Sequence, residues 1–281
     1  MNLKQKAAEA AAYYEANPKV EAVILAGSVA RGWDDRFSDI ELNVLWREEP
    51  SDGDRLLAVK ELGGELLSFY PYEDEEWSEA YTAGGVKFEI SSFLTVTVEK
   101  VVRDVVMEAD PCPEKQCLVA SVNDGIPLAG NDLFLCLHGM AADYPDELQN
   151  AVLRQCIEPG SRWHNREALT ARGDWLMLYS VVTDVQQKIM QMLFALNRMY
   201  VHHPAMKWQR KSLEKMTVKP VRAAERMDKV LTAAPEAGVK ELESLLDDVG
   251  ALVVKAWPKY ADEVAKWTFT RPEQEGLYGR N

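Results

Sequence analysis

The pattern of apolar and polar residues in the first half of the chain predicts short strands separated by helices. Residues 20–25 are mostly apolar without a helical stripe, and residues 38–45 alternate between polar and apolar side chains. Strands are predicted at 20–25, 38–45, 65–70, 84–93 and 117–122. Helices are predicted at 3–16, 51–62 and 98–109. Together these elements predict a mixed sheet with packed helices.

The pattern changes near residue 130. Strand signals disappear after it, and apolar residues recur at helical spacing. Helical segments are predicted at 133–141, 146–157, 166–200, 207–215, 221–234 and 240–265. The sequence therefore predicts an α+β protein with two domains: residues 1–130 with the mixed sheet, and residues 131–281 as a helical bundle.

Composition narrows the class of protein. The chain has 281 residues, of which 47% are hydrophobic and 27% charged, as is typical of globular proteins. No apolar run approaches the roughly 20 residues of a membrane helix, and the N-terminus lacks a signal-peptide core. The four cysteines have no CxxC spacing, which favours a reducing compartment, so a cytoplasmic location is expected.

Net charge bears on possible partners. The formal charge of −13 repels polyanions, so binding to nucleic acid is not expected, whereas small cations would be attracted. The four histidines complete no familiar zinc pattern. A small-molecule partner is therefore expected rather than a membrane or a nucleic acid.

The candidate chemistry begins at the end of the first predicted strand. Gly27-Ser28 breaks that strand and opens a helix, where backbone N–H groups can approach an anion closely. About ten residues later, alternation places Asp39 and Glu41 on one face of the second strand. Two carboxylates beside a phosphate-binding turn suit a Mg²⁺ ion that bridges the phosphates of a nucleotide.

Together these residues resemble a known signature. Gly27-Ser28 followed by Asp39-Ile40-Glu41 is similar to the motif of the polymerase-β-type nucleotidyltransferase superfamily. With Arg31 and Ser38 included, the pattern is most similar to antibiotic nucleotidyltransferases such as the kanamycin enzymes. The resemblance implies Mg²⁺-dependent transfer of a nucleoside monophosphate, expected to come from ATP, to a hydroxyl of a small acceptor. It also implies that Asp39 and Glu41 are metal ligands and that Gly27, Ser28, Arg31 and Ser38 contact the nucleotide.

A third carboxylate is predicted on the strand at 84–93. Alternation puts Lys87, Glu89 and Ser91 on one face, and the resembled family carries an acidic residue on such a strand. Glu89 is therefore expected to be a third metal ligand or the base that deprotonates the acceptor. The alternative is an exposed glutamate paired with Lys87. The acidic run at 73–76 is interpreted as a solvated loop.

The helical half offers weaker candidates. Asp184 lies in a polar stripe of the longest predicted helix and is a second candidate for the base, although it does not align with a family residue. Lys207 and Lys211 follow in a basic loop and are candidates for contact with nucleotide. In each case the alternative is a solvated side chain.

Other functions remain open from the sequence. The chain could be an antitoxin-like or regulatory nucleotidyltransferase that modifies or binds a protein partner, or an inactive binder of a small molecule. The acceptor, the preferred nucleotide and the oligomeric state are not determined by these patterns.

Overall fold

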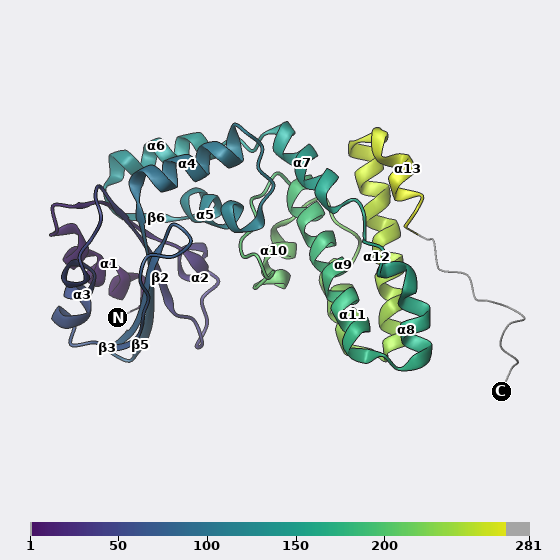
Figure 1. Ribbon diagram of the computed structural model, residues 1–281, viewed down its shortest axis with the longest axis horizontal. Helices are drawn as coiled ribbons and strands as arrows, with labels where there is room; N and C mark the ends of the chain where they lie inside the picture. The colour runs from purple at the N-terminus through teal and green to yellow at the C-terminus, as the bar shows by residue number, and fades with distance from the viewer. Residues whose placement is uncertain (1, 268–281) are drawn as a thin grey trace, which may run out of the picture. The chain divides into compact units, whose positions relative to one another are not determined.

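The computed structural model describes residues 2–267, which form two compact units (Figure 1). The first unit comprises the described residues up to Leu148 together with the short segment Tyr200–Pro204. The second comprises Gln149–Met199 and the described residues from Ala205 onward. The first unit contains a mixed sheet with helices, and the second is helical. The predicted α+β class with a helical C-terminal region is therefore confirmed.

Within the described chain, six strands form one sheet in the order β3-β4-β5-β2-β1-β6. Their bounds are Val20–Leu25 (β1), Ile40–Trp46 (β2), Glu65–Phe69 (β3), Trp77–Ala83 (β4), Val86–Leu94 (β5) and Ile126–Ala129 (β6). β2 and β5 pair in parallel, and the other neighbours pair antiparallel. A parallel pair needs a long crossover, which here contains the helix α3 (Asp52–Glu61) and the strands β3 and β4.

One face of the sheet is apolar and buried beneath α1 (Leu3–Glu15) and α3. Small residues on α1 pack against inward-facing side chains such as Leu42 and Ile90. Both helices begin with a reciprocal capping box, Asn2 with Gln5 and Ser51 with Asp54, which satisfies their first N–H groups. This packing forms the core of the unit and directs the alternate, polar side chains of β2 and β5 to the other face.

The second face of the sheet meets a different set of helices. These are α2 (Gly27–Arg31), α4 (Thr95–Val106), α5 (Pro113–Asn123) and α6 (Asn131–Ala141). α4, α5 and α6 pack on one another. α5 and α6 contact β1, α4 contacts β2 and β5, and α2 and α5 lie on the side of the sheet opposite α1 and α3 (Figure 1). Polar side chains of β2 and β5 therefore face α2 and α5.

The prediction of a strand at residues 117–122 is wrong. These residues belong to α5, whose first turn contains Pro113. The strand that ends the sheet beside β1 is β6, which follows α5. A short run of buried apolar residues fits a strand and a buried helix equally well. Pro113, which suits the first turn of a helix, was the signal for the correct element.

β4 has no counterpart among the predicted strands. Its alternate positions are buried, but one of them is Glu79, so the apolar alternation is interrupted. The Arg55 Nε and Nη2 atoms lie 2.9 and 2.6 Å from one Glu79 carboxylate oxygen. Burial raises the pKa of Glu79 to about 7, although Arg55 acts in the opposite direction. Arg55, which offsets the cost of burying the Glu79 carboxylate, lies on α3 and is distant in the sequence.

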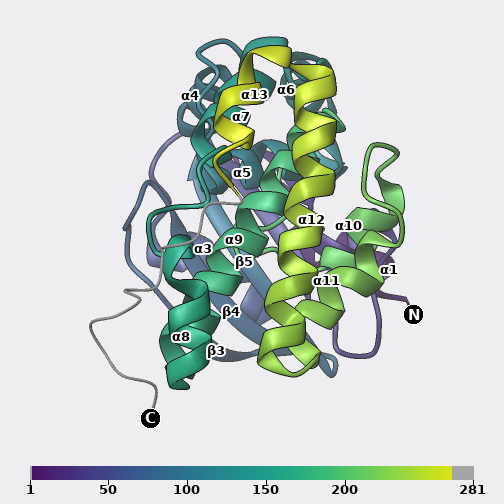
Figure 2. The same cartoon turned by 90° about the vertical axis from the view of Figure 1, so that its right-hand side faces the viewer.

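The second unit contains helices that differ in detail from those predicted. They are α8 (Arg166–Arg172), α9 (Trp175–Leu196), α10 (Gln209–Lys215), α11 (Ala223–Thr232), α12 (Pro235–Ala256) and α13 (Ala261–Val264), with most of α7 (Asp146–Cys156). The helical segment predicted at 166–200 is divided at Gly173, whose φ of 72° ends α8 in a left-handed cap. The longest predicted helix within it, around 175–200, corresponds to α9. α12 packs against α9 and α11, as Figure 2 shows.

The compact units differ in extent from the predicted domains. α6 packs against β1 and β6, so the first unit extends to Leu148, whereas the domain boundary at residue 130 remains a prediction. Between residues 2 and 267, no helix is long and apolar enough to cross a membrane.

Candidate functional site

A cavity of about 240 Å³ lies in the first unit, on the polar face of the sheet. Its lining comes from α2, β2, β5 and α5, from Glu76 ahead of β4, and from the segment Tyr200–Pro204. Several predicted site residues line it: Gly27, Arg31 and Glu41. The polar face therefore joins the predicted motif to residues much later in the chain.

Gly27 and Glu41 are in direct contact. Gly27 has a φ of 65°, and a Cβ atom placed on it would lie 2.3 Å from the Glu41 Cδ and 2.4–2.6 Å from its two carboxylate oxygens. The Glu41 carbonyl also accepts a hydrogen bond of 2.9 Å from the Ala26 N–H. The carboxyl group thus rests on the glycine, and any side chain at position 27 would displace it.

The other predicted carboxylates lie on the same face. In the parallel pairing of β2 with β5, Glu41 is opposite Glu89, and Asn43 is opposite Ser91. Lys87 joins the remaining pair, since its Nζ lies 3.5 Å from Asp39 and forms a close ion pair with Glu89. Its hydrogen bond to Glu89 raises the pKa of Lys87. The structure therefore brings Asp39, Glu41 and Glu89 to one face.

The donor set suits a hard divalent cation, although it is not arranged as a finished metal site. Glu41 and Glu89 are paired across β2 and β5, and Asp39 directly precedes β2. Carboxylate oxygens are the ligands that Mg²⁺ prefers. Among residues 2–267, no three acidic, histidine or cysteine side chains are grouped to hold a metal as they stand. The ammonium of Lys87 instead neutralises two of the carboxylates. A metal held here would require Lys87 to release them.

Arg31 lies in the cavity wall and is held by a carboxylate from α5. Its side chain is 5% exposed, and its Nε donates a hydrogen bond of 3.0 Å to the Asp124 Oδ2. The His202 Nε2 lies 3.2 Å from that same oxygen. Burial acts to raise the pKa of the Asp124 carboxyl, but its bond to His202 and the charge of Arg31 hold that pKa well below its ordinary value. Asp124 is therefore ionised between two donors.

Further polar groups in the cavity were not identified as site residues from the sequence. Asn43 donates a hydrogen bond of 2.7 Å to Ser121 of α5. Burial raises the pKa of Glu76, against the effect of its bond to Ser91, and raises the pKa of the Cys117 thiol to about 11. Glu76 belongs to the acidic run interpreted as a solvated loop, and nothing in the local pattern distinguishes it there.

Ser28 and Ser38 have different surroundings. Ser28 is 3% exposed in the first turn of α2, beside Gly27. The Ser38 Oγ accepts a hydrogen bond of 2.9 Å from the Asp35 N–H, which closes the turn ahead of β2. Ser38 therefore has a structural role in presenting Asp39, and its predicted contact with nucleotide remains a prediction.

The candidates from the helical half lie in the second unit. Asp184 is 3.2 Å from Lys188 on the same helix, and it lines a hollow together with residues 159–162. Lys211 pairs with Glu214 at 3.3 Å, and Lys207 is exposed. Their roles remain predictions.

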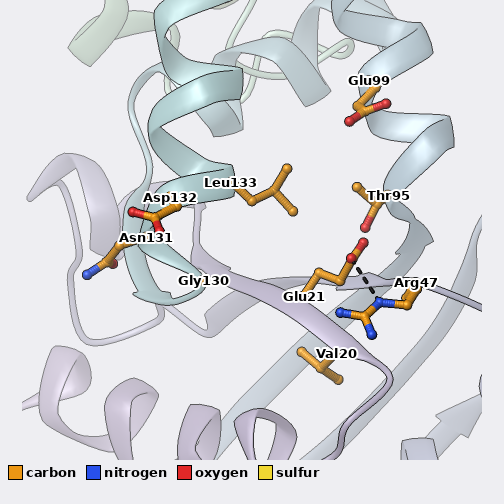
Figure 3. A pocket seen from close by; sticks show the side chains of 9 residues that line it. All are labelled: Val20, Glu21, Arg47, Thr95, Glu99, Gly130, Asn131, Asp132 and Leu133. Carbon is orange, nitrogen blue, oxygen red and sulfur yellow. Dashed lines mark hydrogen bonds and ion pairs between the residues drawn. The ribbon is translucent and has the colours of Figure 1, made fainter.

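A larger hollow of about 490 Å³ lies elsewhere in the first unit (Figure 3). Glu21 reaches Arg47 across it, at 3.1 Å, and Thr95 faces the same carboxylate. The nearby Thr95 hydroxyl is the main cause of the lowered pKa of Glu21, and Arg47 lowers that pKa further. None of the predicted site residues lines this hollow. Despite its size it is therefore a weaker candidate for the site that the sequence motif predicts.

The chain is similar to one family model over part of its length and to a solved structure. A family described as a domain of unknown function, DUF4037, matches residues 112–209, which is less than half of the chain. No curated protein matches the chain. The crystal structure of a nucleotidyltransferase-like protein from Exiguobacterium sibiricum aligns with 92% of this chain and 80% of its own, at 13% sequence identity and a TM-score of 0.39.

The lowered pKa of Asp124 predicts how its contribution to stability changes with pH. Replacing it in Asp124→Asn should cost about 2 kcal/mol of unfolding free energy near neutral pH, because Arg31 loses a charged partner. Asp124 takes up a proton at higher pH in the unfolded chain than in the folded one, so this difference should shrink as the pH falls below about 4. Urea unfolding of both proteins at several pH values below about 5, where histidine charge changes little, measures it. An undiminished difference at the lowest pH would contradict the assignment.

Proposed function

We propose that the chain is a nucleotidyltransferase that moves a nucleoside monophosphate from a nucleoside triphosphate to a hydroxyl group, with release of pyrophosphate. One observation carries the proposal: the Glu41 carboxyl rests on Gly27 and lies in register with Glu89, on the face that also holds Asp39. A carboxylate cluster beside a glycine turn is what metal-assisted phosphoryl chemistry requires.

In this proposal Asp39 and Glu41 hold Mg²⁺, and Glu89 is a candidate for the third ligand. When bound, the metal supplies charge stabilisation for the triphosphate and the departing pyrophosphate. The chain itself contributes position and further charge. The backbone turn at Gly27 and Ser28 lies beside Glu41, where it would meet phosphate oxygens, and Arg31 adds a buried positive charge in the same cavity wall.

The remaining assignments are finer proposals. Glu89 is either the third ligand or the base that takes the proton of the acceptor hydroxyl, with Asp184 as the other candidate for the base. Lys207 and Lys211 would contact the nucleotide, with ATP as the donor. The net charge of −13 supports a cationic acceptor. An antibiotic-like acceptor follows from the resemblance of the motif, and a cytoplasmic setting from the cysteine pattern.

One observation supports the alternative of an inactive binder. Lys87 already neutralises two carboxylates, and no preformed metal cluster is present among residues 2–267. If this ammonium permanently replaces the metal, the cavity would bind small molecules without catalysis. The two proposals differ in whether a divalent cation binds at all.

The first test is a direct assay for the product. The protein would be incubated with ATP, Mg²⁺ and a panel of hydroxylated amines, and acceptors that gain a nucleoside monophosphate would be identified by mass spectrometry. Asp39→Asn and Glu41→Gln should each lower transfer by about 100-fold or more, because a metal ligand is lost. Their melting temperatures should stay near that of the wild type. Wild-type turnover in either variant would remove that residue from the proposed metal site.

The glycine contact can be tested with a matched pair. Gly27 and Gly32 both have positive φ, at 65° and 68°, but only Gly27 has a neighbour that a Cβ would meet. Alanine at either position should cost about 1 kcal/mol of unfolding free energy through backbone strain. Only Gly27→Ala should also lower Mg²⁺ affinity and transfer, by about tenfold or more, because it displaces Glu41. Equal effects of the two substitutions on Mg²⁺ affinity would contradict the proposed role of the contact.

Lys87 decides between the enzyme and the inactive binder. If its ammonium competes with a metal for Asp39 and Glu89, Lys87→Met should bind Mg²⁺ about tenfold more tightly by calorimetry. Lys100→Met is the control, since Lys100 pairs with Glu75 instead, at 3.7 Å. Absence of Mg²⁺ binding in both the wild type and Lys87→Met would favour the inactive binder.

A further inference from the structure

We infer that Asp124 and His202 are positioning residues that hold Arg31 ready for the phosphates of the nucleotide. The stretch at 112–209, which matches a domain of unknown function, would then complete the catalytic site with its two ends. This inference rests on the proposed function and assigns a task to residues that the sequence motif does not include.

Arg31 needs an external partner to keep one direction. It is the last residue of α2, a helix of five residues, and its long side chain has several rotatable bonds. The bond from its Nε to Asp124 fixes the plane of the guanidinium while using one of its five N–H donors. The Trp33 ring lies 5.7 Å from the guanidinium carbon and adds a second restraint. Arg31 is thus held at the cavity wall.

Asp124 is itself held from several directions. It is the C-cap residue of α5. Its Oδ2 accepts the hydrogen bond from the Arg31 Nε and lies 3.2 Å from the His202 Nε2. Its Oδ1 accepts a hydrogen bond of 3.1 Å from the Asn123 side chain. A carboxylate with partners on both oxygens has a defined orientation, so it can transmit that orientation to Arg31.

His202 belongs to a segment that is anchored in the first unit. The Cys117 thiol donates to the His202 carbonyl oxygen at 3.4 Å, and the imidazole lies edge-on to Trp33 with centroids 5.1 Å apart. Two residues earlier, the Tyr200 hydroxyl donates to the Ala141 carbonyl at 3.0 Å. These contacts fix the backbone of the segment as well as the imidazole, so His202 has a defined position in the cavity lining.

A purely structural role is the competing explanation. The Arg31–Asp124 ion pair joins α2 to α5, and this alone would stabilise the fold. A structural role predicts that loss of Asp124 lowers stability and leaves nucleotide affinity unchanged. A positioning role predicts that the loss lowers nucleotide affinity, and only as long as Arg31 is present. Binding measured together with stability therefore separates the two explanations.

The experiment is a double-mutant cycle on ATP affinity, measured by calorimetry with Mg²⁺ and without acceptor. Arg31→Gln and Asp124→Asn should each weaken binding by about tenfold, the effect of one charge-assisted hydrogen bond. The double variant should bind no more weakly than Arg31→Gln alone, because Asp124 acts through Arg31. Wild-type affinity in Asp124→Asn, or independent effects that multiply in the double variant, would overturn the inference.

Controls keep the result interpretable. Lys115→Met removes the ion pairs of α5 with Asp104 and Asp110 without touching Asp124 or His202, so it should lower stability and leave ATP affinity unchanged. If Asp124→Asn does not fold, His202→Gln takes its place and should weaken ATP binding several-fold, and unchanged binding would overturn the inference. A wild-type protein that does not bind ATP would instead overturn the proposed function. ATP binding that is insensitive to Asp124 and His202 would overturn the positioning role alone.

Discussion

The parallel pairing of β2 with β5 is the constraint on which the candidate site depends. It sets Glu41 opposite Glu89 and Asn43 opposite Ser91, so that polar groups from both strands share a face. A shift of register by one residue would turn one strand's polar set into the apolar core beneath α1 and α3. The buried residues of that core, such as Leu42 and Ile90, therefore hold the carboxylates in place from the opposite side of the sheet.

The polar face of the sheet carries both acidic and basic side chains. Asp39, Glu41 and Glu89 share this face, and the ammonium of Lys87 pairs with Asp39 and Glu89. The positive charge of Arg31 is in turn paired with the carboxylate of Asp124. Asp39, Glu89 and Arg31 thus each have an internal partner of opposite sign. In the proposed function, metal binding would displace Lys87 from the two carboxylates, whereas Asp124 would keep its bond to Arg31.

The segment Tyr200–Pro204 lines part of the cavity. It follows the long helix α9 of the second unit, yet it packs within the first, where His202 reaches Asp124. Both Asp124 and His202 lie in the stretch that matches a domain of unknown function, whereas the glycine turn and the carboxylates lie before it. Two parts of the sequence without a shared motif therefore meet in one cavity.

Local sequence patterns determined much of the fold and the acidic face. The apolar run of β1, the alternation of β2 and β5, and the break at Gly27 depend on neighbouring residues, which is why they could be predicted. The same patterns could not separate helix from strand at 117–122, and they missed β4 because Glu79 interrupts its apolar alternation. Only the tertiary structure joined Arg31 to Asp124, 93 positions away. Periodicity reports which face a side chain occupies, but the partner across the cavity is decided by how distant elements pack.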